Sequence, residues 1–105
     1  MADFVRVAST SDIPRGQGRM YEVQGRQVAV FNVEGQFHAV DNVCEHQGGP
    51  LAEGELDEST CTVECPRHGS LFDLRSGRPK TLPAFAPVEP FPGRAEDGQI
   101  KLEVD

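Results

Sequence analysis

The chain has 105 residues, of which only 37% are hydrophobic, and its formal net charge is −7. A chain of this length has room for one domain with a modest core. The acidic charge argues against a nucleic acid ligand, which needs clustered Lys and Arg, and against an anionic membrane surface. It suits a basic protein partner, because complementary charge speeds encounter.

The N-terminal residues 1–4 lack the basic region and the apolar run of a signal peptide. No later stretch approaches the roughly 18 apolar residues of a membrane-spanning helix. The chain has three Cys, an odd number, so a fully paired disulfide framework is impossible and a reducing compartment fits. We therefore expect a soluble, cytoplasmic protein that works as a monomer.

The first part of the chain is typical of short β-strands separated by turns, and it shows no convincing helical period. Gly25 and Gly35 mark two of these turns. The predicted strands cover residues 4–7, 19–23, 26–31 and 37–40. Alternation in the third of them predicts two apolar faces, Val28 and Val30 on one and Ala29 and Phe31 on the other.

Residues 42–57 show no periodicity, and an irregular stretch of that length in a compact domain is usually functional. Further strands are predicted at 60–64, 71–73 and, after an Asp97-Gly98 turn, at 100–104. The segment before the last strand is predicted to be irregular because its prolines lack a backbone donor: Pro79, Pro83, Pro87, Pro90 and Pro92. The whole pattern predicts an all-β sandwich or barrel that carries functional loops.

Two short pairs of metal-ligand residues are the most informative feature of the chain. Cys44-Glu45-His46 and Cys65-Pro66-Arg67-His68 are separated by residues 47–64. Each pair combines one thiolate with one imidazole, which suits a centre with two unlike metal atoms. In a Rieske [2Fe–2S] centre, two His replace two Cys on one of the irons.

Other uses of these residues remain open at this point. Structural zinc also binds two Cys and two His, although its common spacings group like ligands together. A disulfide between Cys44 and Cys65 would leave both His unexplained. Nucleophilic catalysis by a Cys–His pair would use only half of the set.

Around these residues the chain resembles the Rieske ferredoxin family. The resemblance covers residues 44–51, continues to Gly54, and resumes from Cys65 to Pro79. It implies an antiparallel β-sandwich base with a small cluster-binding lobe made of two loops, at about 42–80 in a single domain 1–105. It also implies one [2Fe–2S] cluster, with one iron on Cys44 and Cys65 and the outer iron on His46 and His68.

The chain departs from the high-potential branch of that family. Gly49 and Arg67 stand where that branch has a pair of bracing Cys, and Phe72 stands where it has a Tyr that bonds a ligand sulfur. The resemblance implies that Ser70 still donates to a bridging sulfide, with Gly69 and Pro66 also next to the cluster. With fewer hydrogen bonds to sulfur, we expect a potential near the low end of the Rieske range, about −150 mV.

This combination resembles the ferredoxin component of bacterial ring-hydroxylating dioxygenases, which serve aromatic hydrocarbon catabolism. It implies an electron carrier, not an enzyme, between a flavin-containing ferredoxin reductase and the Rieske centre of a terminal oxygenase. The expected contact surface for both partners is a docking rim of Gly48, Gly49, Pro50, Leu51 and Pro66. A small subunit of an assimilatory nitrite reductase and a zinc-stabilised binding module remain as alternatives.

Two further residues are assigned structural roles. Cys61 is predicted to lie on the same strand face as Val63 and Cys65, where a free Cys packs as a small hydrophobe. His38, in a predicted strand beside Phe37, is likewise expected to be structural.

Overall fold

The computed structural model describes residues 4–43, 50–67, 69–81 and 87–104. Within these ranges the chain forms antiparallel strands and two short 3-10 turns, and no helical segment is long and apolar enough to cross a membrane. The elements are β1 (Phe4–Ser9), η1 (Thr10–Asp12), β2 (Gly18–Val23), β3 (Arg26–Val33), β4 (Gln36–Asp41), η2 (Leu51–Glu53), β5 (Glu55–Asp57), β6 (Thr62–Glu64), β7 (Leu71–Asp73), β8 (Pro90–Phe91), β9 (Gly93–Glu96) and β10 (Gln99–Glu103). The predicted all-β architecture is confirmed.

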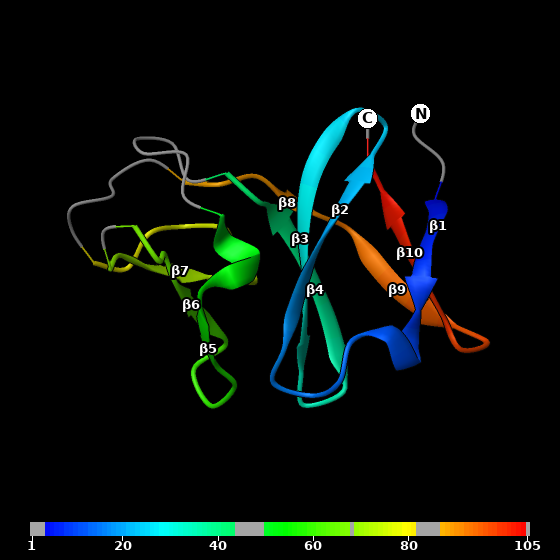
Figure 1. Ribbon diagram of the computed structural model, residues 1–105, viewed down its shortest axis with the longest axis horizontal. Helices are drawn as coiled ribbons and strands as arrows, with labels where there is room; N and C mark the ends of the chain where they lie inside the picture. The colour runs from blue at the N-terminus through cyan, green and yellow to red at the C-terminus, as the bar shows by residue number, and fades with distance from the viewer. Residues whose placement is uncertain (1–3, 44–49, 68, 82–86, 105) are drawn as a thin grey trace.

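Two sheets form what we call the base, shown on the right of Figure 1. One has the strand order β1-β10-β9 and the other β2-β3-β4-β8. The apolar core between them includes Val28 and Val30 from β3 and Ile100 and Leu102 from β10. The period-two pattern of the last strand thus marks a face that is buried against the second sheet.

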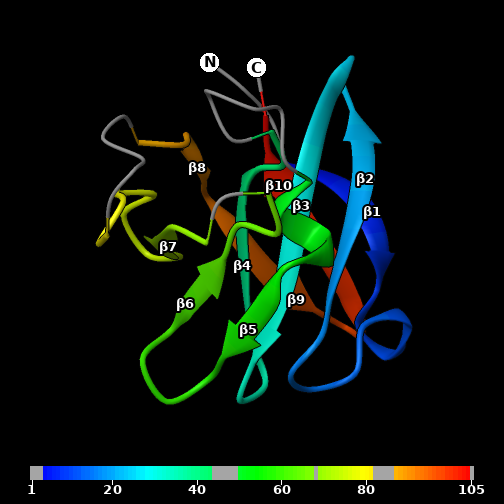
Figure 2. The same cartoon turned by 60° about the vertical axis from the view of Figure 1, so that its left-hand side comes forward.

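A third sheet, β5-β6-β7, forms with η2 what we call the lobe. It packs on the other face of the β2-β3-β4-β8 sheet, and Figure 2 shows β5 in front of this sheet with β6 to its left. The core between lobe and base joins Ala29 and Phe31 of β3 to Val63 of β6 and Phe72 of β7. Both faces of β3 are therefore buried, with the alternation that the sequence predicts.

The hairpin turns explain why several strand ends can be predicted from the sequence. The turns at residues 24–25, 34–35 and 97–98 each have positive φ at both central residues, with Gly in the second position. This is the geometry of a type I′ turn, which matches the right-handed twist of the flanking strands. The turns predicted at these positions are confirmed.

Three strands were not predicted. β5 is short, and β9 is exposed at all of its positions, so it has no apolar alternation to reveal it. β8 contains Pro90, and the predicted irregular segment is wrong at this point. Pro90 is tolerated there because β8 is the edge strand of its sheet, opposite Val40.

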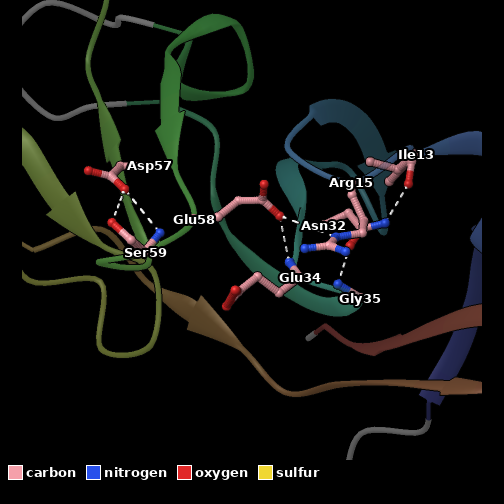
Figure 3. Close-up of polar contacts among 8 residues, drawn as sticks. All are labelled: Ile13, Arg15, Asn32, Glu34, Gly35, Asp57, Glu58 and Ser59. Atoms are coloured by element: carbon pink, nitrogen blue, oxygen red, sulfur yellow. Dashed lines mark hydrogen bonds and ion pairs between the residues drawn. The ribbon is translucent and has the colours of Figure 1, made fainter.

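Glu58, in the turn between β5 and β6, makes a polar connection from the lobe to the base (Figure 3). Its Oε1 accepts a hydrogen bond from the backbone N–H of Glu34 at 2.7 Å. The same oxygen lies 3.7 Å from Nε of Arg15. The carboxylate therefore holds the β5–β6 turn against the β3–β4 hairpin and the segment before β2.

Two other polar contacts shape the surroundings of Glu58 (Figure 3). Asn32, which is buried, donates from Nδ2 to the carbonyl of Ile13 at 2.8 Å and accepts from the Gly35 N–H at 2.8 Å. Asp57 accepts from both the backbone N–H and the hydroxyl of Ser59, at 3.0 and 2.6 Å. Both sides of the lobe–base connection are thus fixed by local side-chain bonds.

His38 lies on β4 in a half-buried position, opposite Phe31 of β3. Burial lowers the pKa of His38 below its ordinary value of 6.5, Arg75 lowers it further, and Asp73 opposes the shift. The folded protein therefore favours the neutral imidazole at this position.

We expect Glu58→Ala to lower the thermal midpoint of the cluster-containing protein by about 5 °C. The variant loses a charge-assisted hydrogen bond, which contributes about 1 kcal/mol to stability at a partly exposed site. A loss of that size lowers the thermal midpoint of a domain of this length by several degrees. Glu58→Gln is the matched control, because its amide oxygen can still accept from Glu34. Equal midpoints for the two variants would show that the hydrogen bond from Glu34 does not stabilise the connection.

The depressed pKa of His38 predicts a pH-dependent contribution to stability. The unfolded chain binds a proton at this residue below about pH 6.5, whereas the folded protein binds it only at lower pH. The wild type should therefore lose stability relative to His38→Gln as the pH falls from 7.5 to 5.5. The measurement is the difference between the two thermal midpoints at each pH, and a constant difference would refute the prediction.

Candidate metal centre

Cys65 directly follows β6 and begins the second of the two predicted loops. Its N–H donates to the Ser70 carbonyl at 2.8 Å, and its own carbonyl accepts from the Gly69 N–H at 2.9 Å. Gly69 has a φ of 76°, a conformation that glycine adopts without strain. Cys65 and Ser70 are both fully buried. The turn from 65 to 70 is thus closed by backbone bonds, and the residues at both of its ends are buried.

The two ends of the first loop are held together by Asn42 and by an isolated bridge. Val43 pairs with Pro50, which places the residues on either side of 44–49 next to one another. Asn42 is buried, and it accepts from the Leu51 N–H at its carbonyl (2.8 Å) and from the Ala52 N–H at Oδ1 (2.9 Å). One side chain and its backbone therefore fix where this loop leaves and rejoins the fold.

The bases of the two loops lie against each other at Gly54. A Cβ at this position would lie 2.0 Å from the carbonyl oxygen of Glu64, the residue before Cys65. Because no side chain fits in that space, glycine allows the segment after η2 to pass directly over the end of β6. Leu51 of η2 packs in the same core as Cys65. The geometry thus brings the first loop to the buried end of the second.

Of the four predicted ligands, Cys65 lies within the described residues, and Cys44, His46 and His68 lie outside them. Within the described part of the chain, no three His, Cys, Asp or Glu side chains are grouped as a metal site would require. Among the other predicted site residues, Pro66 is exposed and Phe72 is buried in the core between lobe and base.

The docking rim needs one correction. Leu51 was predicted to be part of this exposed rim, but its side chain is 0% exposed and packs in the core between lobe and base. A residue that is fully buried cannot contact a partner, so Leu51 has a packing role. Pro50 is partly exposed and Pro66 is exposed, whereas Gly48 and Gly49 lie outside the described residues.

Sequence reasoning missed two residues beside the first loop. Asn42 has no distinctive motif, and its position between a strand and the first Cys is the only cue to its bracing role. Val43 is 41% exposed, which is unusual for a large hydrophobic residue in this structure. Its place in the sequence, directly before Cys44, could have marked it as a surface residue of the site.

Cys61 is buried among apolar side chains, as predicted. It differs from the prediction in its local structure, because it precedes β6 and adopts a positive φ of 56° in the turn. Burial raises the pKa of the Cys61 thiol, Arg75 opposes this shift, and Asp73 adds to it. A thiol that stays protonated is a poor nucleophile and a poor metal ligand.

The residues present fit a Rieske cluster by their donor chemistry. Cys65 provides a sulfur donor at a backbone-closed turn, and the other three predicted donors belong to the two loops whose bases meet at Gly54. Two thiolates and two imidazoles are the ligand set of a [2Fe–2S] centre of this type. The third cysteine, Cys61, stands outside both Cys–His pairs, and its raised thiol pKa disfavours the thiolate that a metal needs.

Comparison with known proteins agrees with this geometry. The family model of the Rieske [2Fe-2S] domain matches residues 3–92. The 3-phenylpropionate/cinnamic acid dioxygenase ferredoxin subunit of Photorhabdus laumondii is 37% identical over 98 residues, which cover 93% of this chain and 91% of that protein.

Two solved structures are similar over nearly the whole chain. The ferredoxin of carbazole 1,9a-dioxygenase from Nocardioides aromaticivorans has a TM-score of 0.94 at 28% identity and covers 99% of this chain and 100% of that one. The complex of reduced oxygenase and oxidized ferredoxin in carbazole 1,9a-dioxygenase contains a chain with a TM-score of 0.86 at 31% identity, covering 95% and 92%.

These similarities confirm the predicted fold and the predicted cofactor, one [2Fe–2S] cluster, which excludes the zinc alternative. They also confirm the prediction of a ferredoxin, because the relatives are named as ferredoxin subunits. The chain belongs to the Rieske [2Fe-2S] domain family.

Proposed function

We propose that this protein carries single electrons from a flavin-containing ferredoxin reductase to the Rieske centre of a terminal ring-hydroxylating oxygenase. The observation that carries the proposal is the relationship to dioxygenase ferredoxin subunits, at 37% identity over nearly the whole chain. The bound cluster supplies one-electron redox chemistry. The protein supplies the ligands, the buried surroundings and a surface through which a partner can approach.

We infer that Cys44 and Cys65 hold one iron and that His46 and His68 hold the outer one. The support is the joint spacing of the two pairs and the position of Cys65 at a closed, buried turn. The hydroxyl of Ser70, fully buried in the same turn, is proposed to donate to cluster sulfur. Gly69, Pro66 and Phe72 are proposed to shape the surroundings of the cluster.

We also propose a monomeric, cytoplasmic protein with one domain over 1–105 and a cluster-binding lobe at about 42–80. The core that joins Phe31 of the base to Phe72 of the lobe supports a single domain. The cytoplasmic location is supported by the need to keep ligand thiols reduced. After the correction at Leu51, the proposed docking rim consists of Gly48, Gly49, Pro50 and Pro66.

The first test of this proposal is spectroscopic. The purified protein should be red-brown, with one [2Fe–2S] cluster per chain, and reduction by dithionite should produce the electron paramagnetic resonance signal of a mixed-ligand cluster. One zinc per chain without inorganic sulfide would refute the cluster. A native cluster that passes no electron to an oxygenase would instead refute the function.

Identical substitutions at two cysteines test the ligand assignment. Cys65→Ser should give colourless protein, because the serine oxygen is a poor replacement for a thiolate that binds iron. Cys61→Ser should keep the visible spectrum of the cluster and lose only about 1–3 kcal/mol of stability, the cost of burying a hydroxyl in an apolar core. The assignment fails if Cys65→Ser retains the native spectrum.

Aspartate substitutions on the docking rim test the partner surface. Pro66→Asp and Pro50→Asp should slow electron transfer with both partners by about tenfold, equivalent to about 1.4 kcal/mol. Pro50→Asp, which is not placed beside the cluster, should also leave the cluster spectrum unchanged. Charge reversal at Glu103, on β10 of the base, is the control and should change the rates much less. Wild-type rates for both rim variants in stopped-flow measurements would show that the surface is wrong.

A further inference from the structure

A surface hollow of about 520 Å³ lies between the edge strand β2 and the turn η2. Its lining includes Met20 of β2, Ala52 and Glu53 of η2, and the residues that flank the first loop, Asn42 and Pro50. We call the surface made by Met20, Val43, Pro50 and Ala52 the shelf. Because Asn42 and Pro50 stand on either side of 44–49, the shelf continues directly from the base of the first loop.

Strand register explains why Met20 faces the shelf. Met20 pairs with Ala29, and Gly18 pairs with Phe31, so these β2 residues share the sheet face on which the lobe packs. Tyr21 lies on the opposite face, against the core between the two base sheets. Met20 therefore belongs to the lobe-facing side of the sheet, at an edge that the lobe leaves uncovered.

Exposed apolar side chains gather at this place. Among the described residues, the large hydrophobic side chains that are exposed are Met20, at 46%, and Val43, at 41%. Pro50 connects the two positions, because it pairs with Val43 and lines the hollow together with Met20, although Val43 is not part of that lining. A single exposed apolar residue needs no explanation, but neighbouring ones beside a functional loop are typical of an interaction surface.

The charges around the shelf indicate the chemistry of its partner. Glu22 shares the sheet face of Met20, and both Glu22 and Glu53 are exposed. Arg19 also contributes to the lining of the hollow but lies on the other side chain face of β2. The surroundings are therefore acidic on balance, and they complement an apolar side chain that is flanked by Lys or Arg.

We propose that the terminal oxygenase docks over the shelf as well as the docking rim, and that it places an apolar side chain flanked by basic residues against Met20. This inference rests on the proposed function. The oxygenase is favoured as the occupant because a similar ferredoxin chain, at 31% identity, is found in a complex with its oxygenase. Interfaces of redox partners bury little area, so one apolar contact beside the loops is a large share of the binding surface.

The test compares two substitutions that introduce the same charge, Met20→Glu and Gln36→Glu. Gln36 is exposed at the start of β4, beside the β3–β4 turn and away from the hollow. Each cluster-containing variant is reduced with dithionite, freed of excess reductant, and mixed with the oxygenase purified from the organism that encodes this chain. We expect the half-saturating concentration of Met20→Glu to rise about tenfold, and those of Gln36→Glu and Met20→Leu to stay within about twofold of the wild type.

Each other outcome overturns the proposal in a recognisable way. Wild-type behaviour of Met20→Glu, with an unchanged cluster spectrum, shows that the shelf does not contact the oxygenase. If Met20→Glu raises the half-saturating concentration equally in the reaction with the reductase, the shelf cannot be assigned to the oxygenase. A wild-type dimer that Met20→Glu dissociates in sedimentation velocity assigns the shelf to a second copy of the chain. Failure of the wild type to reduce any oxygenase refutes the proposed function itself, and the shelf with it.

Discussion

A single apolar core joins the lobe to the base, and the proposed site depends on it. Phe31 enters this core from β3 and Phe72 from β7, and both are essentially fully buried. Side chains of this size contribute about 1.5–3 kcal/mol each when they are buried. Cys65 belongs to the same core, so a proposed cluster ligand is anchored in the apolar core between lobe and base. The position of the second loop follows from hydrophobic packing.

The central strand β3 connects this core to the one inside the base. Val28 and Val30 pack between the two base sheets, whereas Ala29 and Phe31 pack against the lobe. Gly18 of β2 leaves room for the Phe31 ring, because a Cβ there would lie 2.4 Å from a ring carbon. A shift of β3 by one residue would move the Phe31 ring away from the space that Gly18 leaves for it, so this pair favours the observed register. The lobe therefore sits on a sheet whose own register is set by the base.

Much of this fold is predictable from local patterns. The alternation in β3 and β10 and the glycine turns at 25, 35 and 98 predict strands and hairpins where the structure has them. β9 and the two-residue β8 were missed because they form through pairing with partner strands. An exposed strand or a proline-containing edge strand carries no hydrophobic period that could reveal it.

The proposed site, like the fold, can be predicted from the sequence only in part. Ligand spacing and the flanking glycines indicate a Rieske centre directly, because the chemistry requires those residue types in that order. Leu51 was misassigned because a leucine beside a loop reads equally well as a surface contact or as an anchor. Only the three-dimensional structure shows that η2 turns its side chain into the core. Asn42 braces the first loop by accepting a hydrogen bond from Ala52, ten positions later in the chain, and no sequence pattern encodes that contact.

The bridge between Val43 and Pro50 affects which substitutions the first loop can accept during evolution. Because the scaffold itself holds these two residues together, it bears the entropic cost of closing the segment between them. Asn42 then holds η2 in register from the side of β4. Substitutions at 45 and 47–49 that keep Cys44 and His46 can thus alter the surroundings of the proposed cluster while the hydrophobic anchor at Leu51 keeps its place. An architecture of this kind separates the evolution of redox properties from the evolution of folding.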